Sequence, residues 1–340
     1  MNRRQVTDLL RHHAGILAIS GPFARRTLRG LGRRTKIVYA HHVGAPAPHL
    51  AAFGPAFGPE ELDAQLTTLA RHFEFAPLAK VLEQTEATAS LVAVTFDDGF
   101  DLMGSGAKEV LDAHGVKATT FVLTAMVDNR GLMWRNKLSA ICALRAPDAY
   151  VPAYNRVTAQ VGAAAIREAS ELLGAAWRWD MARKEELADE LWKACDMPPL
   201  AEYLDEHRPY LTRDQLATWL ADGHGVGLHT DTHPDCSRLD ADGVHIEILD
   251  PARRLRAELG VAELHFSYPF GRRCRPELEP LLERDGLLAC ALGIRGFSPR
   301  ATNPMHLDRA SIEGDMRFAV YGKAFLDFPR ASSTEQAKRT

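Results

Sequence analysis

The stretch LVAVTFDDG at residues 91–99 contains the clearest fold signal in the chain. Six apolar or β-branched residues with no polar alternation predict a strand that is buried on both faces, as in a parallel sheet. Asp97, Asp98 and a glycine then end the strand directly. In isolation such an ending is more often a solvated turn in which an aspartate caps a helix. The stretch therefore predicts a parallel sheet and leaves the role of the two carboxylates open.

Short apolar runs of the same kind recur along the chain and alternate with helix-like segments such as 107–114. This alternation predicts an α/β fold with a mostly parallel sheet, either a barrel or a doubly wound sheet. The other runs lie at 37–40, 119–123, 225–228 and 264–268, with weaker candidates at 287–292 and 307–312.

Polar clusters follow four of these runs, at the point where each predicted strand ends. In barrels and open α/β sheets alike, functional sites are built at the carboxyl ends of parallel strands. Segments far apart in the sequence should therefore meet at one edge of the sheet. The clusters are His41-His42, Asp97-Asp98, the HTDTH segment 229–233 and the YPFG segment 268–271.

His229 and His233 are candidate metal ligands. Two imidazoles and one carboxylate with an open position form a water-activating zinc site, and the same ligand types also hold ferrous iron. The alternative is a surface loop whose histidines have hydrogen-bond partners. Since the chain has 14 histidines, the spacing alone does not decide between the two readings.

Three parts of the chain depart from the strand–helix alternation. Residues from about 135 to 210 show helical patterns, at 163–175 and 183–195, with no convincing strand, and are expected to form a helical insertion. The first 36 residues carry nine Lys/Arg against one acid, so 1–35 is expected to be a basic extension, which could contact anionic lipid headgroups. Residues 36–328 would then form the barrel domain, and 329–340 a disordered tail.

Composition narrows the class of protein. The formal net charge of -3 gives no reason to expect a nucleic-acid partner. Five scattered cysteines without a CxxC pair indicate neither a disulfide framework nor a thiolate metal site, and suit a reducing compartment. The apolar run 14–19 is stopped by Ser20-Gly21-Pro22, unlike a signal peptide. We therefore expect a cytoplasmic protein, with the basic extension as a candidate for contact with the inner membrane face. The sequence does not determine the oligomeric state.

The motifs TFDDG (95–99), HTDTH (229–233) and FSYPFG (266–271), in this order, resemble the successive motifs of the polysaccharide deacetylase family, the NodB homology domain. The resemblance extends from about Lys36 to Ile312. It implies a distorted parallel (β/α) barrel that hydrolyses acetyl groups on sugars. It also implies that Asp98, His229 and His233 hold a divalent metal, with zinc as the default, and that Asp97 is the general base.

The resemblance suggests further site residues less directly. An oxyanion would be held by the metal and a backbone N–H near Phe270 in the turn formed with Tyr268 and Pro269, although this turn could also be purely structural. Trp134, at the start of the insertion, is a candidate substrate contact, with core packing as the alternative. Arg309 could orient Asp97 or could be a surface charge after a strand.

The candidate for the general acid rests on a shorter and less complete resemblance than the three motifs above. The segment YAHHV (39–43) resembles a tyrosine-histidine-x-valine segment of one branch of the family, which makes His41 the candidate acid. The alternative is that either histidine only packs at the barrel mouth. Many members also have an arginine where this chain has Ser267, and Arg272 or Arg273 could replace it.

The expected function is therefore a metal-dependent hydrolase that removes an acetyl group from an N-acetylated sugar of a polysaccharide, glycolipid or precursor. Two alternatives remain at this point. The same fold could hydrolyse a non-sugar amide or a formyl group, or it could be a non-catalytic carbohydrate-binding barrel.

Overall fold

The computed structural model describes residues 33–54, 57–83, 90–261 and 264–313. The expected tail at 329–340 lies outside these residues, and so does the expected basic extension apart from residues 33–35. Among the helices of the described ranges, none combines the length and the apolar character that crossing a bilayer requires.

Parallel strands form a nearly closed barrel in the order β10-β8-β7-β6-β5-β4-β2-β11, and each neighbouring pair along this order is parallel. The predicted α/β class with a parallel barrel is thus confirmed, and the two weaker strand candidates are present. The strands are β2 (Ile37–Ala40), β4 (Leu91–Phe96), β5 (Thr119–Val122), β6 (Gly225–Leu228), β7 (Leu264–Ser267), β8 (Leu288–Gly293), β10 (Leu307–Asp308) and β11 (Ala310–Ser311).

A single short segment closes the barrel. β10 pairs with β8, β11 pairs with β2, and only Arg309 separates β10 from β11. Arg309 therefore lies at the closure, between the segment that pairs with β8 and the segment that pairs with β2, the first strand of the barrel. Three minor strands lie outside this path: β3 (Glu74–Phe75) pairs with β4, and β1 (Arg34–Thr35) pairs antiparallel with β9 (Ser298–Pro299).

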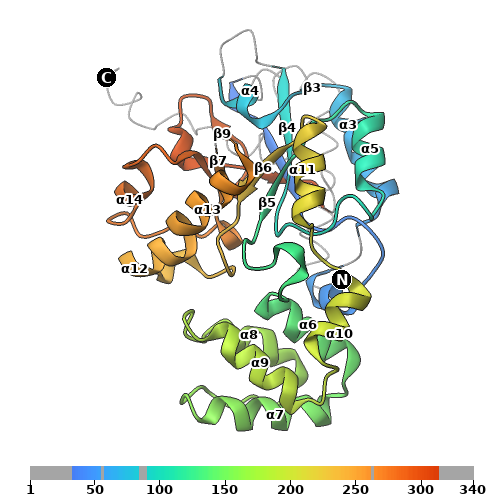
Figure 1. Cartoon of the computed structure of the whole chain (residues 1–340), viewed down its shortest axis with the longest axis vertical. Coiled ribbons are helices and arrows are strands. Elements are labelled where there is room, and N and C mark those ends of the chain that lie inside the picture. The colour runs from blue at the N-terminus through green and yellow to red at the C-terminus, as the bar shows by residue number, and fades with distance from the viewer. Residues whose placement is uncertain (1–32, 55–56, 84–89, 262–263, 314–340) are drawn as a thin grey trace, which may run out of the picture.

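Helices cover the outside of the barrel, with α3, α5 and α11 on one side and α12 to α14 on the other (Figure 1). Their boundaries carry ordinary sequence signals. α11 begins after Thr212, whose hydroxyl accepts a hydrogen bond from the Gln215 N–H, and α13 ends at Gly260, which has a φ of 64°. The helices are α3 (Pro59–Ala70), α4 (Leu78–Leu82), α5 (Ala107–Ala113), α11 (Arg213–Ala221), α12 (Ala241–Val244), α13 (Asp250–Leu259) and α14 (Glu279–Glu283).

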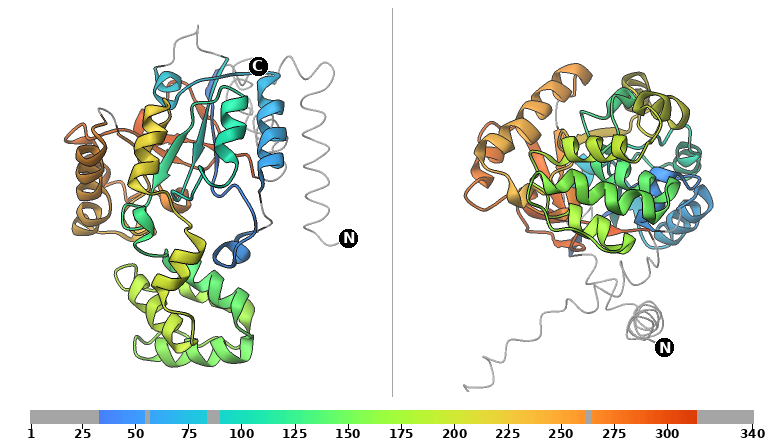
Figure 2. Two further views of the ribbon diagram at one scale, coloured as in Figure 1. Left: turned by 45° about the vertical axis from the view of Figure 1, so that its right-hand side comes forward. Right: turned by 90° about the horizontal axis from the view of Figure 1, so that it is seen from below.

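Five helices between β5 and β6 form a separate layer at one end of the barrel (Figures 1 and 2). They enclose their own apolar cluster, which includes Trp134, Tyr154 and Trp192. Every residue between β5 and β6 is described, and this stretch contains no strand. The helices are α6 (Trp134–Leu144), α7 (Pro147–Ala159), α8 (Leu172–Ala176), α9 (Lys184–Ala194) and α10 (Leu200–His207).

The helix expected at 163–175 is only partly correct. Residues 163–168 are not helical, and a short helical turn at Ala169–Glu171 leads into α8. The side chain of Asn155 binds both backbone groups of Ile166. Its amide N–H donates to the Ile166 carbonyl (2.9 Å), and its oxygen accepts a hydrogen bond from the Ile166 N–H (2.8 Å). This tertiary contact outweighs the helix propensity of the three alanines at 163–165.

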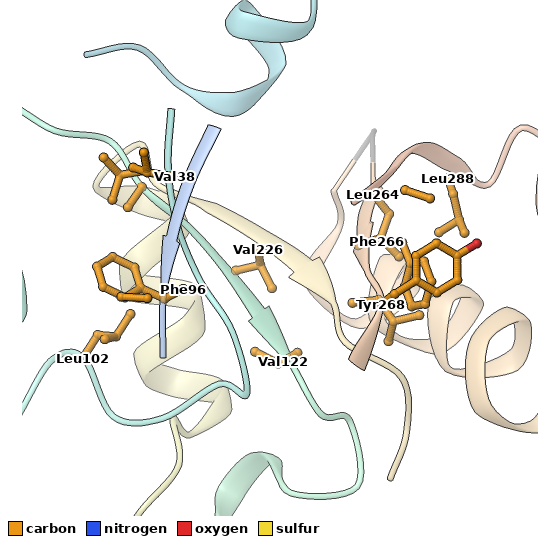
Figure 3. Close-up of a cluster of buried hydrophobic side chains, with 14 of the residues drawn as sticks. Val38, Phe96, Leu102, Val122, Val226, Leu264, Phe266, Tyr268 and Leu288 are labelled. Atoms are coloured by element: carbon orange, nitrogen blue, oxygen red, sulfur yellow. The ribbon is translucent and has the colours of Figure 1, made fainter. Parts of the chain in front are cut away.

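The main core lies between the strands and the helices that cover them. Figure 3 shows Val38, Phe96 and Leu102 in one group, and Leu264, Phe266 and Leu288 in another beyond Val122 and Val226. Strands β2, β4, β5 and β7 are buried at every position. Each fully buried side chain of this size stabilises the fold by about 1.5–3 kcal/mol. Packing of the core thus fixes the positions of the strand ends, and the polar clusters that follow these ends are placed by the same packing.

Candidate active site at the carboxyl ends of the strands

The four polar clusters meet at the carboxyl edge of the barrel, as the parallel strand order requires. They line one cavity of about 990 Å³. The helical layer contributes Met133 and Arg135 to its wall, and a 3-10 turn at Pro48–Phe53 contributes Leu50 and Phe53. Cavity-lining residues from the predicted site are His41, His42, Asp97, Asp98, His229, His233, Tyr268 and Phe270.

Asp98, His229 and His233 form a compact and buried cluster. The Nε2 atoms of His229 and His233 each lie 3.3 Å from Asp98 Oδ1. One ligand atom from each residue can be chosen such that all three lie within 4.8 Å of one another. This is the only such group of three or more His, Cys, Asp or Glu residues in the described ranges, and it is the set that the resemblance implies.

The donor set fits a divalent metal. Asp98 Oδ1 is buried and has no hydrogen-bond partner among the described residues, which is costly unless another group satisfies it. The Ser267 carbonyl accepts a hydrogen bond from His229 Nδ1 (2.7 Å), which leaves a lone pair on Nε2, and Nε2 faces Asp98. Two imidazoles and one carboxylate suit zinc or another first-row metal.

The charge states of the ligands also fit metal binding. Burial lowers the pKa of His233 to about 4, and the nearby Asp98 carboxylate offsets this only in part, so His233 is neutral at pH 7. Burial by itself would raise the pKa of Asp98, but its interactions with the His233 and His229 rings outweigh this and lower the pKa well below its usual range. A neutral imidazole and an ionised carboxylate are the forms that coordinate metals.

The backbone is strained at the site. Asp98 (φ 70°), Thr230 (φ 77°), His233 (φ 62°) and Phe270 (φ 59°) are four of the eight non-glycine residues with positive φ in the described ranges. Such conformations cost on the order of 1–3 kcal/mol each and persist only where the surroundings enforce them. Their concentration here indicates that side-chain placement at this edge takes precedence over local backbone preference.

Glu247 holds the loop 229–233 in place. Its carboxylate accepts hydrogen bonds from the Thr232 N–H (2.9 Å) and hydroxyl (2.5 Å), and its carbonyl accepts from the Asp231 N–H (2.9 Å). Glu247 lies in a π-helical turn, His245–Leu249, between α12 and α13. From the helical layer, Lys184 donates to the Thr232 hydroxyl (2.7 Å). Two separate parts of the fold therefore fix the histidine loop.

Trp134 supports the same loop. Its indole N–H donates to the His233 carbonyl (3.1 Å), and its side chain is only 1% exposed and does not line the cavity. The expectation of a substrate contact is therefore corrected. The Trp134 ring packs inside the helical layer, and its contact with the site is the hydrogen bond from its N–H to the backbone carbonyl of His233.

Asp97 is held by Arg309, at the closure of the barrel. The guanidinium donates to both carboxylate oxygens at 2.7 Å, and further hydrogen bonds go to Thr95 Oγ1 (3.0 Å) and Ser267 Oγ (2.6 Å). Ser267 in turn donates to Asp97 (3.2 Å). Arg309 is fully buried, so it acts on Asp97 and is not a substrate contact.

This contact also shows how the chain accommodates Ser267, where an arginine is more usual. Arg309 reaches Asp97 from the junction of β10 and β11, and its Nη2 also donates to the Ser267 hydroxyl (2.6 Å). Arg272 and Arg273 do not take this place, because Arg272 pairs with Asp235 (3.0 Å) and Arg273 donates to the carbonyls of Met305 (2.9 Å) and Leu307 (2.6 Å).

The Asp97 carboxyl group is ionised at neutral pH. Burial raises its pKa, but the opposite charge and hydrogen bonds of Arg309 outweigh this, and the net pKa lies below the usual range. A carboxylate has about four lone-pair sites, so two bonds to Arg309 leave sites that can accept a proton. Asp97 lines the cavity beside Asp98, which is the placement that a general base requires.

His41 is paired with Glu313, a residue that the sequence reasoning missed. Glu313 accepts hydrogen bonds from the His41 backbone N–H (2.8 Å) and from His41 Nδ1 (2.9 Å). Although burial lowers the pKa of His41, Glu313 and the two aspartates raise it to about 10. His41 is thus protonated at neutral pH. The available signal was that Glu313 directly follows the last predicted strand.

The turn at 268–271 contributes Tyr268 and Phe270 to the cavity wall. Phe270 packs edge-on against the His233 ring, with the centroids 4.4 Å apart, while Pro269 is buried and does not line the cavity. Gly271 has a φ of 63°, and a Cβ there would lie 3.0 Å from the Ile294 N. The turn therefore needs glycine at this position, and the assignment of an oxyanion donor to it stays a prediction.

Comparison with known proteins identifies the family. The model of the polysaccharide deacetylase family matches residues 84–281, which is more than half of the chain. The protein therefore belongs to the polysaccharide deacetylase family. The matched range contains the Asp98, His229 and His233 cluster and ends before Arg309 and Glu313.

Solved structures share the fold at low sequence identity. A deacetylase from Streptococcus pyogenes, PplD, in complex with acetate is 17% identical, with a TM-score of 0.52 over 82% of this chain and 92% of its own. IcaB from Ammonifex degensii is 16% identical, with a TM-score of 0.52 over 85% and 97%. A polysaccharide deacetylase from Bacillus cereus is 13% identical, with a TM-score of 0.51 over 85% and 68%. The expectation of a deacetylase-type barrel is thereby confirmed.

Proposed function

We propose that the protein is a metal-dependent hydrolase that removes the acetyl group from an N-acetylated sugar of a polysaccharide, glycolipid or precursor. The observation that carries the proposal is the buried Asp98, His229 and His233 cluster beside Asp97, in a cavity that His41 also lines. A metal site, a carboxylate base and a protonated histidine are the groups that amide hydrolysis needs. Family membership supports the sugar substrate.

Asp98, His229 and His233 would hold the metal, with zinc as the first candidate. When bound, a divalent metal supplies Lewis acidity toward water and toward the acyl carbonyl. Ser267 fixes the orientation of His229 through its carbonyl, and Trp134 fixes the His233 backbone. Such supporting hydrogen bonds typically change metal affinity or activity by about 10- to 100-fold.

Asp97 and His41 would carry the protons. Asp97 removes a proton from the attacking water, while Arg309 keeps both carboxylate oxygens in place. As the C–N bond breaks, the sugar nitrogen leaves as an amine and takes a proton from His41, whose Nδ1 is bonded to Glu313. The net reaction adds one water across the amide and yields an amino sugar and acetate.

The decisive experiment measures acetate. Purified protein loaded with zinc or cobalt should release acetate from at least one N-acetylhexosamine substrate in a panel of monosaccharides, oligosaccharides and nucleotide- or lipid-linked sugars. Formylated amino sugars and cyclic amides belong in the same panel, because turnover of these alone would favour the non-sugar or formyl alternative. If metal is bound and no acetyl sugar reacts, the proposed function is wrong.

The structure weakens the case for the two alternatives. The unusual Ser267 was one reason to consider a different substrate, but Arg309 provides a guanidinium beside Asp97 that also contacts Ser267. A non-catalytic barrel would have no need for an intact, strained and buried metal-ligand set. The acetyl-sugar hydrolase remains the function that the site supports best.

A further inference from the structure

Arg135 lines the cavity but has no role in the proposed reaction. It is in the first turn of α6 and lines the cavity from the side of the helical layer. Its guanidinium carbon stands 4.6 Å from the ring centroid of Phe53, 5.0 Å from that of Phe270 and 5.8 Å from that of Trp177. Aromatic rings from three different segments therefore fix a cation at the mouth of the site.

The guanidinium of Arg135 has no carboxylate or hydrogen-bond partner among the described residues. A second arginine at Trp177 differs in this respect: Arg272 also stacks on the Trp177 ring (4.9 Å), but it forms an ion pair with Asp235 (3.0 Å). Burial lowers the pKa of Arg135, and the Asp98 charge offsets this in part. The five donors of Arg135 thus remain available to the cavity.

The other charged side chains of the cavity wall already have partners. Among the described cavity-lining residues, Asp97 pairs with Arg309, Asp98 faces His229 and His233, Glu313 pairs with His41, and Glu61 accepts the Gly58 N–H at the start of α3. A cation in a partly desolvated position without a counter-charge is unfavourable. Because no carboxylate pairs directly with Arg135 among the described residues, a negatively charged group of a ligand would complement this wall.

Arg135 is also close to the reaction centre. The Phe270 ring contacts both the guanidinium of Arg135 (5.0 Å) and the His233 ring (4.4 Å). Only one aromatic ring thus separates Arg135 from a metal-ligand candidate. A group bound by Arg135 would belong to the same sugar as the acyl group or to its immediate neighbour.

We propose that Arg135 binds an anionic group of the substrate, a phosphate or a carboxylate, so that the site selects acylated sugars that carry a negative charge near the acyl group. A planar guanidinium held by aromatic rings is preorganised for two parallel hydrogen bonds to such an oxyanion. This inference rests on the proposed deacetylase function. The competing explanation is that Arg135 only clamps Phe53 and Phe270 together.

The test compares neutral and anionic substrates on the metal-loaded protein. The set is N-acetylglucosamine, its 1-phosphate, its 6-phosphate and N-acetylmuramic acid, and acetate release gives kcat/KM for each. We expect at least one anionic sugar to exceed the neutral one about tenfold or more, and the phosphate and carboxylate members show which oxyanion is preferred. Arg135→Gln should lower kcat/KM for that sugar by about 10- to 100-fold and for the neutral sugar by less than about twofold.

Two further variants separate recognition from packing. Arg135→Lys keeps the charge without the planar fork and should fall between the wild type and Arg135→Gln. Arg272→Gln removes the other guanidinium that stacks on Trp177. Arg272 pairs with Asp235 and does not line the cavity, so this variant should leave the preference for the anionic sugar unchanged. If wild-type kcat/KM is equal for neutral and anionic sugars, or if Arg135→Gln lowers all substrates alike, the inference is wrong.

Product binding distinguishes this inference from the proposed function. Glucosamine 1-phosphate and 6-phosphate carry no acyl group and cannot be turned over, and calorimetry measures their binding to the metal-loaded protein. Tighter binding than glucosamine, lost in Arg135→Gln, would support the anion site even if no acetyl sugar released acetate, in which case only the deacetylase proposal would fail. Equal binding of glucosamine and both phosphates would contradict the anion site.

Discussion

Arg309 and Asp97, 212 residues apart in the sequence, form a buried two-point ion pair in which both N···O distances are 2.7 Å. The pair lies where the barrel closes, since Arg309 separates β10 from β11. The final strand segment of the barrel therefore orients the residue to which we assign the role of base.

Arg309→Met should remove this pair and leave a buried carboxylate without its counter-ion. We expect a loss of about 3–5 kcal/mol in the free energy of unfolding, measured by urea denaturation at pH 7. The pKa of Asp97 is lowered in the folded protein, so this stabilisation is present above the ordinary aspartate pKa and is lost as the pH falls. In the variant the acid limb of kcat/KM should move to higher pH. Equal stability of variant and wild type at pH 7 would contradict this account.

Asp97→Asn tests the assigned base. The amide keeps the shape of the carboxyl group but cannot take a proton from water, so kcat should fall by about 10²- to 10⁴-fold. Metal content, measured by atomic absorption, should remain that of the wild type, because the ligand candidates are Asp98, His229 and His233. A fully active variant would show that Asp97 is not the base.

Metal removal should abolish activity reversibly. Dialysis against a chelator should eliminate acetate release, and added zinc or cobalt should restore it. His233→Ala removes one of three ligands and should prevent restoration at metal concentrations that suffice for the wild type. A suitable control is His224→Ala, since His224 is also a buried histidine but lies outside the cluster. Activity that persists in chelated, metal-free protein would exclude metal dependence.

Glu313→Gln should change the pH profile. The proposed acid works only when it is protonated, so activity should decline as the pH rises through the pKa of His41, which is about 10. Glu313 is the largest contribution that raises this pKa. In the variant the decline should therefore begin at lower pH, while the acid limb stays in place. If kcat against pH keeps its alkaline limb in the variant, Glu313 does not set the protonation of His41.

Trp134→Phe should weaken metal binding without blocking the cavity. It removes the hydrogen bond to the His233 carbonyl, and we expect about tenfold weaker zinc affinity, measured by competition with a chromophoric chelator. Trp192→Phe is the matched control, because the Trp192 indole donates to a backbone carbonyl, that of Pro198 (2.7 Å), within the helical layer. Both variants should lose about 1 kcal/mol of stability from the lost hydrogen bond. Equal zinc affinities in the two would show that Trp134 has no special part in the site.

Local patterns in the sequence predicted the barrel strands and the meeting of the polar clusters at one edge, and the resemblance to the deacetylase family supplied the metal-ligand candidates. The run 91–96 is apolar at each position but Thr95, and buried parallel strands have this composition for a local reason, which is that both faces pack against other elements. Asp98, His229 and His233 each lie at or just after a strand end. Parallel strands bring their ends to one edge whatever the order of the strands, so their proximity followed from the sequence.

Local patterns were less reliable where a single tertiary contact decides the conformation. Residues 163–168 have the composition of a helix, but the Asn155 side chain holds Ile166 in a non-helical segment. Trp134 was a candidate substrate contact because it begins the insertion, with core packing as the alternative, and the structure places its ring in the core of the helical layer.

Only the tertiary structure decided which residues support the chemistry. From the sequence Arg309 could have been a surface charge and Ser267 departed from the family pattern, while Glu313 and Arg135 belong to no recognisable motif. Each of them acts through a partner that is distant in the sequence, such as Glu313 on His41 across 272 residues. Composition and spacing determine where strands begin and end. Which side chains then meet depends on how the barrel closes and where the helical layer packs, and these are properties of the whole chain.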